Sequence, residues 1–310
     1  MEAQAAGQLG SQAAIAPATR IGPVTLTVAD LDRQSTFYQD VLGLKLLRRD
    51  GPMVSLGAGG EDLVRLIEDR AAPRARGTTG LYHFAVLVPD RKELARRLAR
   101  LYALRYTHYP TDHVMTETTY LSDPEGNGIE IYVDTPERGT WGVYNGTFAA
   151  RAADGTLRSG RDPLDVEALL ALLAPEDRLD GPLPEATKIG HIHLHVADLE
   201  HAVRFYHDVL GFDIMTSLPA GGAAFVSAGG YHHHIGLNTW LGEGAPPPPP
   251  GSLGLRYFTI VVPDRAEIDR IASRVAEAGL RFDRAEAGIT VRDPSQNQLW
   301  LTHRPDSAAP

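Results

Sequence analysis

The stretch IGPVTLTVADLDRQSTFYQDVLGL at residues 21–44 recurs as IGHIHLHVADLEHAVRFYHDVLGF at residues 189–212. The two copies align over 24 residues without a gap. A second pair of related segments follows the first: GLYHFAVLVPDRKELARRLARL begins at residue 80 and GLRYFTIVVPDRAEIDRIASRV begins at residue 254. Self-similarity of this kind indicates a repeated structural unit. The chain therefore contains four related segments, arranged as two similar halves.

Each of the four segments predicts the same local structure. Val24, Leu26 and Val28 alternate with other residues, and a period of two is typical of a strand with one buried face. An aspartate placed to cap the next helix follows each strand, namely Asp30, Asp90, Asp198 and Asp264. In two segments the helix is followed by Gly43 or Gly211, which suits a left-handed C-terminal residue. Three short strand candidates complete each βαβββ module.

A module of this size cannot close a hydrophobic core alone, so the modules must pair. The predicted fold is α+β, with four βαβββ modules that pair into two cups. The chain divides into a disordered leader (1–19), an N-terminal domain with modules 1 and 2 (20–135), a linker (136–186), a C-terminal domain with modules 3 and 4 (187–304) and a tail (305–310).

Two connecting segments have patterns of their own. The linker is expected to carry one short helix over residues 164–173, opened by Asp162-Pro163. The proline run at 246–250 predicts an extended polyproline connection between modules 3 and 4, because proline suits neither a helix interior nor a central strand.

Composition restricts the classes of function. The chain has 310 residues, of which 43% are hydrophobic and 22% charged, as in globular proteins with a full core. A formal net charge of −9 argues against a nucleic-acid surface, and no apolar run approaches the roughly 20 residues of a membrane helix. The chain contains no cysteine, which excludes disulfides and thiolate-ligated metals. The N-terminus lacks the pattern of a signal peptide, so a cytoplasmic protein is expected.

These repeats resemble the vicinal oxygen chelate superfamily, which includes glyoxalases, fosfomycin-resistance proteins and extradiol ring-cleaving dioxygenases. The resemblance covers residues 20–135 and 187–303. The stretch GYHHHIGLNTW at residues 230–240 is also similar to the two-domain catechol 2,3-dioxygenase-like members. The resemblance implies that paired modules curl into a cup. It also implies that metal ligands come from the first strand of a module and from a glutamate on its last strand.

The resemblance allows the ligand positions to be placed on this sequence. The first-strand positions of modules 1 to 4 are Pro23, His83, His191 and Tyr257, and the last-strand positions are near Arg65, Glu130, Gly236 and Trp300. Only modules 2 and 3 carry metal-binding side chains there. The implied site is therefore His83, Glu130 and His191, with modules 2 and 3 sharing the metal cup and modules 1 and 4 forming a degenerate one. In two-domain dioxygenases all three ligands lie instead in the C-terminal half.

A site with two histidines and one carboxylate leaves open positions on the metal, at which non-haem Fe(II) holds a bidentate substrate together with O₂. Fe(II) is therefore the expected cofactor. Mn(II) suits the same sulfur-free ligands, and zinc is a substitute that a crystal could carry. The expected partners are a small aromatic diol and O₂, without nucleic acid or membrane. Whether the chain forms a homo-oligomer stays open.

The resemblance also implies catalytic side chains. In the extradiol dioxygenases a histidine just before an apolar triplet acts as an acid–base near O₂. This histidine corresponds to His233, with His232 and His234 as alternates. Tyr120, three residues before Asp123-Pro124, matches a tyrosine that hydrogen-bonds a substrate oxygen. His113 is near the position of another substrate-contacting histidine.

Several further side chains are expected near the substrate. His232, His234, Asn238 and Trp240 are candidates to line its cavity, since such cavities are mostly apolar and aromatic with a few polar groups. His193 and His195 share the strand face of His191, and they either line the same cup or have structural roles.

The leading function is extradiol cleavage of a catechol-like ring. One alternative is a glyoxalase-like metal-dependent isomerase or lyase, but such sites usually have four protein ligands, and the fourth position here is Gly236. Another alternative is a non-catalytic protein that binds a small molecule. Members of that class commonly lack the ligands, whereas this chain has three together with Tyr120.

Overall fold

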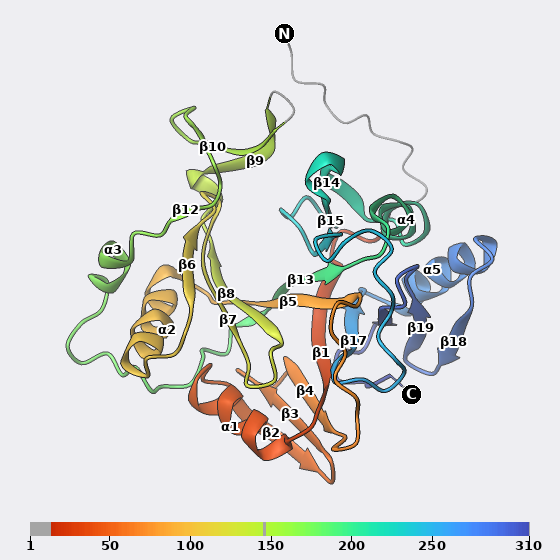
Figure 1. The fold of residues 1–310 in the computed structure, drawn as a ribbon, viewed down its shortest axis with the longest axis horizontal. Coiled ribbons are helices and arrows are strands. Elements are labelled where there is room, and N and C mark those ends of the chain that lie inside the picture. Colours follow the sequence, from red (N-terminus) through yellow and green to blue (C-terminus); the bar gives the residue numbers. More distant parts are fainter. Residues whose placement is uncertain (1–13, 145–146, 310) are drawn as a thin grey trace.

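The computed structural model describes residues 14–144 and 147–309 (Figure 1). Module 1 consists of β1 (Arg20–Val28), α1 (Leu31–Asp40), β2 (Lys45–Asp50), β3 (Met53–Gly57) and β4 (Val64–Glu68). Module 2 consists of β5 (Gly80–Leu87), α2 (Arg91–Ala103), β6 (Tyr109–Asp112), β7 (Thr116–Ser122) and β8 (Gly128–Asp134).

The second half of the chain repeats this order. Module 3 consists of β13 (Lys188–His195), α4 (Leu199–Arg204), its π-helical continuation η2 (Phe205–Val209), β14 (Asp213–Leu218), η3 (Pro219–Gly221), β15 (Ala223–Ser227) and β16 (Ile235–Asn238). Module 4 consists of β17 (Gly254–Val261), α5 (Arg265–Glu277), β18 (Phe282–Ala285), β19 (Gly288–Arg292) and β20 (Gln298–Thr302).

The sheets show which modules pair. One large sheet has the order β18-β19-β20-β17-β1-β4-β3-β2, so it joins modules 4 and 1 through the antiparallel strands β17 and β1. The second large sheet has the order β12-β6-β7-β8-β5-β13-β16-β15-β14. It joins modules 2 and 3 through the antiparallel strands β5 and β13. Within every module the first strand runs parallel to the last. The predicted α+β fold and its pairing into two cups are therefore confirmed, and each half of the chain contributes one module to each sheet.

The helix ends follow the signals in the sequence. In each module the carboxylate of the predicted capping aspartate accepts a hydrogen bond from the backbone N–H three residues later, as Asp30 does from Arg33 and Asp198 does from His201. Gly43 and Gly211 have φ angles of 86° and 92°. A side chain at such a positive φ is strained, which explains why glycine ends both helices.

In each half of the chain one buried tyrosine–aspartate hydrogen bond connects the two modules. The Tyr38 hydroxyl on α1 donates to the Asp123 carboxylate at 3.1 Å, and Tyr206 donates to Asp293 at the same distance. Each aspartate also accepts hydrogen bonds from backbone N–H groups of its own turn, which precedes the last strand of its module. Burial, together with the adjacent carboxylate, raises the pKa of both tyrosines well above its ordinary value. Each tyrosine thus stays a donor and ties a helix to the neighbouring module.

The predicted disordered leader is wrong for residues 14–19. Ile15 is buried in the core, and its N–H donates to the Gly211 carbonyl at 2.8 Å. The N–H of Ala16 donates to Glu267 on α5 at 3.1 Å. A single apolar residue in an alanine-rich stretch has no periodicity, so the sequence alone does not reveal this contact. Residues 1–13 of the predicted leader lie outside the described residues.

The predicted linker contains more structure than one helix. It forms η1 (Pro136–Arg138), β9 (Gly139–Tyr144), β10 (Thr147–Ala152), β11 (Leu157–Arg158), β12 (Asp162–Pro163) and α3 (Val166–Leu170). Strands β9, β10 and β11 make a small sheet, and β12 pairs with β6 at the edge of the second large sheet. Helix α3 is capped by Asp165, so Asp162-Pro163 does not open it. In Figure 1 the β9–β10 hairpin and β14, the edge strand at the other end of this sheet, both lie at the top of the view.

The degenerate cup between modules 1 and 4 is closed by the chain itself. Arg65 has only 1% of its surface exposed and forms an ion pair with Asp62 at 2.7 Å. Its two remaining guanidinium nitrogens donate to the carbonyls of Ser307 and Pro305. The predicted tail is therefore bound in this cup, where Arg65 lies at the sheet position that Glu130 has in module 2.

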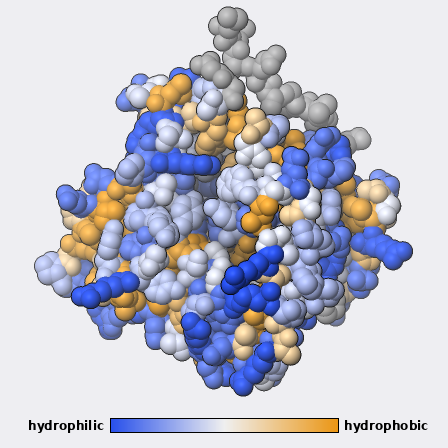
Figure 2. Space-filling view, viewed as in Figure 1, coloured by the Kyte–Doolittle hydropathy of each residue, from blue (hydrophilic) through white to orange (hydrophobic). Residues whose placement is uncertain are grey.

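The space-filling view shows the face of the molecule that is seen in Figure 1. Hydrophilic residues cover most of that face, and hydrophobic residues are scattered among them (Figure 2). In the described part of the chain no helix has the length and apolar character needed to cross a membrane.

We predict that Tyr38→Phe and Tyr206→Phe each lower the free energy of unfolding by about 1–3 kcal/mol, because each removes a buried hydrogen bond to a carboxylate. The matched control is Tyr106→Phe, whose hydroxyl donates to the Ser122 carbonyl at an exposed site, and its effect should be smaller. Urea denaturation of the three variants measures the difference. Equal losses in all three would contradict the role of the buried bonds.

Candidate metal centre and its cavity

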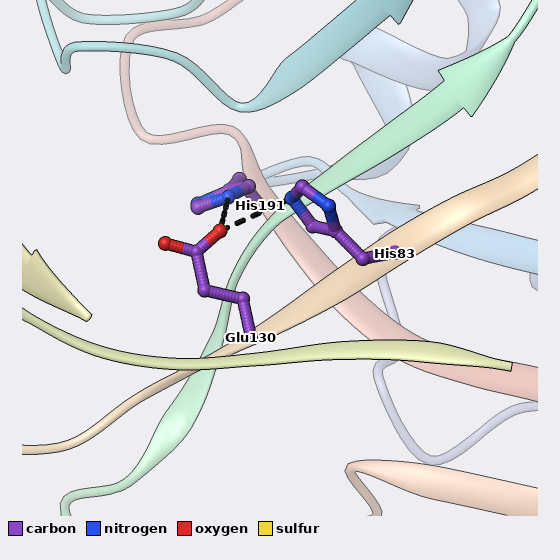
Figure 3. Close-up of side chains that lie close together, drawn as sticks. All are labelled: His83, Glu130 and His191. Atoms are coloured by element: carbon purple, nitrogen blue, oxygen red, sulfur yellow. Dashed lines mark hydrogen bonds and ion pairs between the residues drawn. The ribbon is translucent and has the colours of Figure 1, made fainter. Parts of the chain in front are cut away.

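Three neighbouring strands bring together the predicted metal ligands. His83 comes from β5, Glu130 from β8 and His191 from β13 (Figure 3). The Nε2 atoms of His191 and His83 lie 3.0 and 3.1 Å from the same carboxylate oxygen of Glu130. The three ligand atoms all lie within 4.8 Å of one another, and the three residues are buried. The structure thus assembles a group that could hold a metal ion, with ligands from both halves of the chain.

The register of the strands explains this geometry. Ala85 on β5 lies opposite Glu130 on one side and opposite His191 on the other. Side chains alternate along a strand, so His83, two residues before Ala85, points to the same face. Because Ala85 is small, the face between Glu130 and His191 is left free of bulky atoms. A register shift at Gly190 precedes His191, and a Cβ at Gly190 would lie 1.8 Å from the Tyr132 hydroxyl.

The electrostatics of the group suit a cation. Burial by itself raises the pKa of Glu130, but the adjacent His191 and His83 imidazoles hold it well below its ordinary value. Burial lowers the pKa of His191 to about 4, although Glu130 acts in the opposite direction. At neutral pH the site therefore contains an ionised carboxylate beside a neutral imidazole. These are the protonation states in which the two side chains bind metals.

The ligands line a cavity of about 310 Å³. Of the side chains predicted near the substrate, Tyr120, His113, His233 and Trp240 also line it. The unassigned His193 lines it too, beside His83, with ring centroids 5.1 Å apart. A cavity of this size fits a single substituted ring.

Tyr120 and His113 form a hydrogen-bonded pair in the wall of the cavity. The His113 Nδ1–H donates to the carbonyl of Gly160, which leaves His113 Nε2 as an acceptor in the neutral ring. The Tyr120 hydroxyl lies 2.8 Å from this nitrogen and donates to it. Burial, and then the negative charge of Glu130, raise the pKa of Tyr120 well above its ordinary value. Tyr120 is therefore a protonated phenol at neutral pH.

A chain of hydrogen bonds runs from His233 to the half-exposed Asp134. The Asp134 carboxylate lies 3.1 Å from His232 Nε2 and accepts a hydrogen bond from its N–H, and in this tautomer the lone pair of His232 is on Nδ1. His233 Nδ1 lies 2.7 Å from that atom and donates to it. Burial, and then the neighbouring His191 ring, lower the pKa of His233 well below its ordinary value. His233 is therefore neutral, with its lone pair on Nε2.

Three of the residues expected to line the cavity lie elsewhere. The histidine triplet precedes β16 rather than belonging to it, so regular alternation does not apply to it. His232 faces Asp134, and His234 Nδ1 accepts from the Ala228 N–H at 3.2 Å. Asn238 is fully buried and accepts from His195 Nδ1 at 2.7 Å. None of these three side chains is among the residues lining the cavity.

The sequence analysis missed much of the cavity wall. Its aromatic part includes Tyr82, Trp141, Phe148 and Phe225, and its polar part includes Thr111, Thr116 and Arg161. Trp141, Phe148 and Arg161 belong to the segment predicted as a linker. The aromatic residues Trp141 and Phe148 were the one signal in the sequence that this segment has a role in the cavity. The segment has no repeated counterpart in the chain, so its place in the fold could not be inferred.

Comparison with known proteins shows which family the chain belongs to. The family model described as "Glyoxalase/Bleomycin resistance protein/Dioxygenase superfamily" matches residues 20–131 and 188–301. The chain belongs to this superfamily. It is 44% identical to the catechol-2,3-dioxygenase of Bacillus subtilis (strain 168) over 279 residues, which are 89% of this chain and 94% of that protein. The resemblance recognised from the repeats is thereby confirmed, including the likeness to catechol 2,3-dioxygenase-like members.

Solved structures of low sequence identity share the superfamily fold. A Bacillus subtilis subsp. subtilis str. 168 protein with a provisional dioxygenase assignment has a TM-score of 0.61 at 16% identity, covering 91% of this chain and 84% of that one. Glyoxalase I from Zea mays has a TM-score of 0.54 at 17% identity, covering 92% of each chain. Both likenesses concern the fold.

The position at which some sites of this superfamily have a fourth ligand is blocked. Gly236 on β16 occupies it, and a Cβ there would lie 2.8 Å from the ring of His193. Strand register pairs the two residues directly. Any larger residue at 236 would displace His193, so the group stays at three ligands.

We predict that Ala85→Leu abolishes metal binding although every ligand remains, because the larger side chain fills the space between Glu130 and His191. Ala85→Ser, which is almost the same size, is the matched control and should bind metal as the wild type does. Metal content after dialysis, with circular dichroism to confirm folding, measures the effect. Wild-type metal content in a folded Ala85→Leu protein would contradict this account of the site.

We further predict that His234 makes stability depend on pH. Burial lowers its pKa to about 4, from about 6.5 in the unfolded chain, so the unfolded state alone gains a proton between these values. Stability is therefore present above pH 6.5 and lost as the pH falls toward 4. His234→Asn should reduce the loss between pH 7 and 5 by about 1–2 kcal/mol in urea denaturation. An unchanged loss would contradict this.

Proposed function

We propose that this protein is an extradiol ring-cleaving dioxygenase, which opens a catechol-like aromatic diol with O₂ at an Fe(II) ion held by His83, His191 and Glu130. The observation that carries the proposal is the open three-ligand group on the floor of a cavity with aromatic walls. The 44% identity to a catechol-2,3-dioxygenase over most of both chains supports the same reaction class.

The donor set fits a divalent metal of this kind. Two imidazole nitrogens converge on one carboxylate oxygen, and buried His83 Nε2 lacks a good hydrogen bond to any described residue. A buried nitrogen without a partner is costly unless a ligand satisfies it. Two neutral histidines and one carboxylate on one side are typical of Fe(II) sites that activate O₂. Bound Fe(II) would lower the pKa of the diol hydroxyls and hold the diol close to O₂.

Tyr120 would orient the diol. Its hydroxyl donates to His113 Nε2 in the free enzyme, and its oxygen can still accept a hydrogen bond from a substrate hydroxyl. The bond from His113 to the Gly160 carbonyl holds the histidine ring in one orientation. Because Tyr120 stays protonated, it could equally donate to a diol oxygen after that oxygen has lost its proton.

His233 would accept a proton from the diol. Its Nε2 carries the lone pair, since its Nδ1–H is engaged by His232. The proton gained on Nε2 makes the ring a cation, which His232 and Asp134 stabilise through their hydrogen bonds. His233 could return the same proton to the product, as a general acid–base does.

The closed fourth position favours ring cleavage over the isomerase alternative. Glyoxalase-like isomerases usually hold the metal through a glutamate from each paired module, and the ring of His193 leaves no room for a carboxylate at position 236. Three protein ligands leave more of the metal open for a chelating diol together with O₂.

The proposal is tested by anaerobic reconstitution with Fe(II), followed by addition of catechol and air. We expect a yellow ring-fission product, detected by absorbance at the blue edge of the visible range. Parallel reconstitution with Mn(II) and zinc identifies the metal that supports turnover, and zinc should give none. Metal bound without any ring-fission product from catechol or substituted catechols would overturn the proposal.

Variants connect the activity to the site. His83→Ala, His191→Ala and Glu130→Gln should each lose most of the bound metal and all of the colour. His195→Ala is the matched control, because His195 follows His191 on β13 but does not belong to the ligand group. His233→Asn should keep the metal and lose about 10²- to 10⁴-fold in kcat, as loss of a general acid–base does. Wild-type turnover in that variant would contradict the role of His233.

A further inference from the structure

Arg161 is a cation in the wall of the cavity that has no carboxylate partner among the described residues. It is exposed at the mouth, and its guanidinium carbon lies 5.8 Å from the ring centroid of Trp240. Within residues 14–144 and 147–309 its side chain forms neither an ion pair nor a hydrogen bond; its only polar contact is the backbone N–H, which donates to Ser159 Oγ at 2.9 Å. An arginine has five N–H donors, so it is available to a ligand.

The neighbouring acids do not neutralise Arg161 because other cations bind them. Asp112 accepts from Arg138 at 2.8 Å and lies 3.4 Å from Arg158. Asp162, the next residue along the chain, accepts from Arg158 at 2.9 Å and from the Ser159 hydroxyl at 2.8 Å. Asp112 and Asp162 are thus already paired with Arg138 and Arg158, and neither carboxylate forms an ion pair with Arg161.

The backbone of the turn is held in place beside the catalytic wall. Gly160, with a φ of 68°, accepts a hydrogen bond from His113, the partner of Tyr120. On the other side of Arg161, β12 pairs with β6. Arg161 therefore extends from a fixed point at the rim of the cavity, and its position relative to the ligand group is built into the fold.

The cavity has a buried end and an open end. His83, Glu130 and His191 are buried at its floor. Tyr82 and Trp240 are 40% and 43% exposed, and their rings lie 5.3 Å apart. Arg161 contacts this exposed pair through Trp240. A diol ring bound at the floor would direct the substituents opposite its hydroxyls toward Arg161.

We infer that the preferred substrate is an aromatic diol with a carboxylate on the ring side opposite the hydroxyls, and that Arg161 binds this carboxylate. The inference rests on the proposed function, because it takes the diol to lie at the ligand group. Glu130 is the single carboxylate among the described cavity residues, and it is buried, whereas Arg161 is exposed. A planar guanidinium matches a carboxylate through two parallel hydrogen bonds.

The kinetic test compares two substrates of similar shape, of which one is an anion and the other is neutral. The probes are 3,4-dihydroxybenzoate and 3,4-dihydroxybenzamide, given to the Fe(II)-loaded enzyme. The wild type should favour the benzoate in kcat/KM. Arg161→Met keeps the apolar stem beside Trp240 and should reduce this preference about 10- to 100-fold, as expected for the loss of a hydrogen-bonded ion pair. Arg161→Lys should restore part of it.

Arg151→Met is the matched control, because Arg151 stacks on Tyr144 in the neighbouring small sheet and does not line the cavity. It should leave the preference unchanged. A wild type that cleaves both diols equally well, or an Arg161→Met variant with the full preference for the benzoate, would overturn the inference and leave the proposed function standing.

A binding measurement separates the two hypotheses. Under anaerobic conditions the quenching of Trp141 and Trp240 fluorescence reports binding of either probe without turnover. The benzoate should bind more tightly than the amide to the wild type, and equally to Arg161→Met. This result, with no cleavage of either probe by the Fe(II)-loaded enzyme after air is admitted, would support the anion site and overturn the dioxygenase proposal. Equal binding of both probes to the wild type would overturn the anion site itself.

Discussion

The antiparallel pairing of β5 with β13 is the constraint on which the ligand group of His83, Glu130 and His191 depends. It joins module 2 to module 3 and places Ala85 between Glu130 and His191. A slip of one residue would turn the side chains of one strand to the opposite face, because side chains alternate along a strand. The group therefore exists only when the two halves of the chain have folded around each other, and neither half alone contains all three ligands.

The other cup shows what the same fold does without a metal. Its equivalent positions carry Arg65 and Trp300, both buried. Arg65 bonds to Asp62 and to carbonyls of the tail, and the Trp300 indole N–H donates to the Ser307 hydroxyl at 3.2 Å. In the cup of modules 1 and 4 the polar groups of Arg65 and Trp300 are thus hydrogen-bonded by the chain itself. In the cup of modules 2 and 3, His83 Nε2 lacks such a partner among the described residues. This division allows one cup to stabilise the molecule while the other keeps polar groups unsatisfied for a ligand.

The segment between the halves completes the cavity. Its Trp141 indole donates to the His113 carbonyl at 2.7 Å, and its Gly160 carbonyl orients the His113 ring. The same segment supplies Arg161 at the rim. The repeated modules thus supply the metal group and Tyr120, whereas the unrepeated segment supplies part of the wall and a charge. The ligand group and the charged side chain at the rim of the cavity are in this way supplied by different parts of the chain.

The sequence by itself determined the modules and their helix caps, because strand alternation, capping aspartates and repeats are local patterns that survive in any fold that contains them. The ligand positions followed from the resemblance to the superfamily, placed on these modules. It also indicated the pairing of modules 2 and 3, since only they carry ligands. Tertiary structure alone decided that Ile15 is buried and that Trp141, Phe148 and Arg161 line the cavity. It also decided that His233 lines the cavity, whereas His232 and His234 do not. These features depend on contacts between segments far apart in the chain, and no local periodicity encodes such contacts.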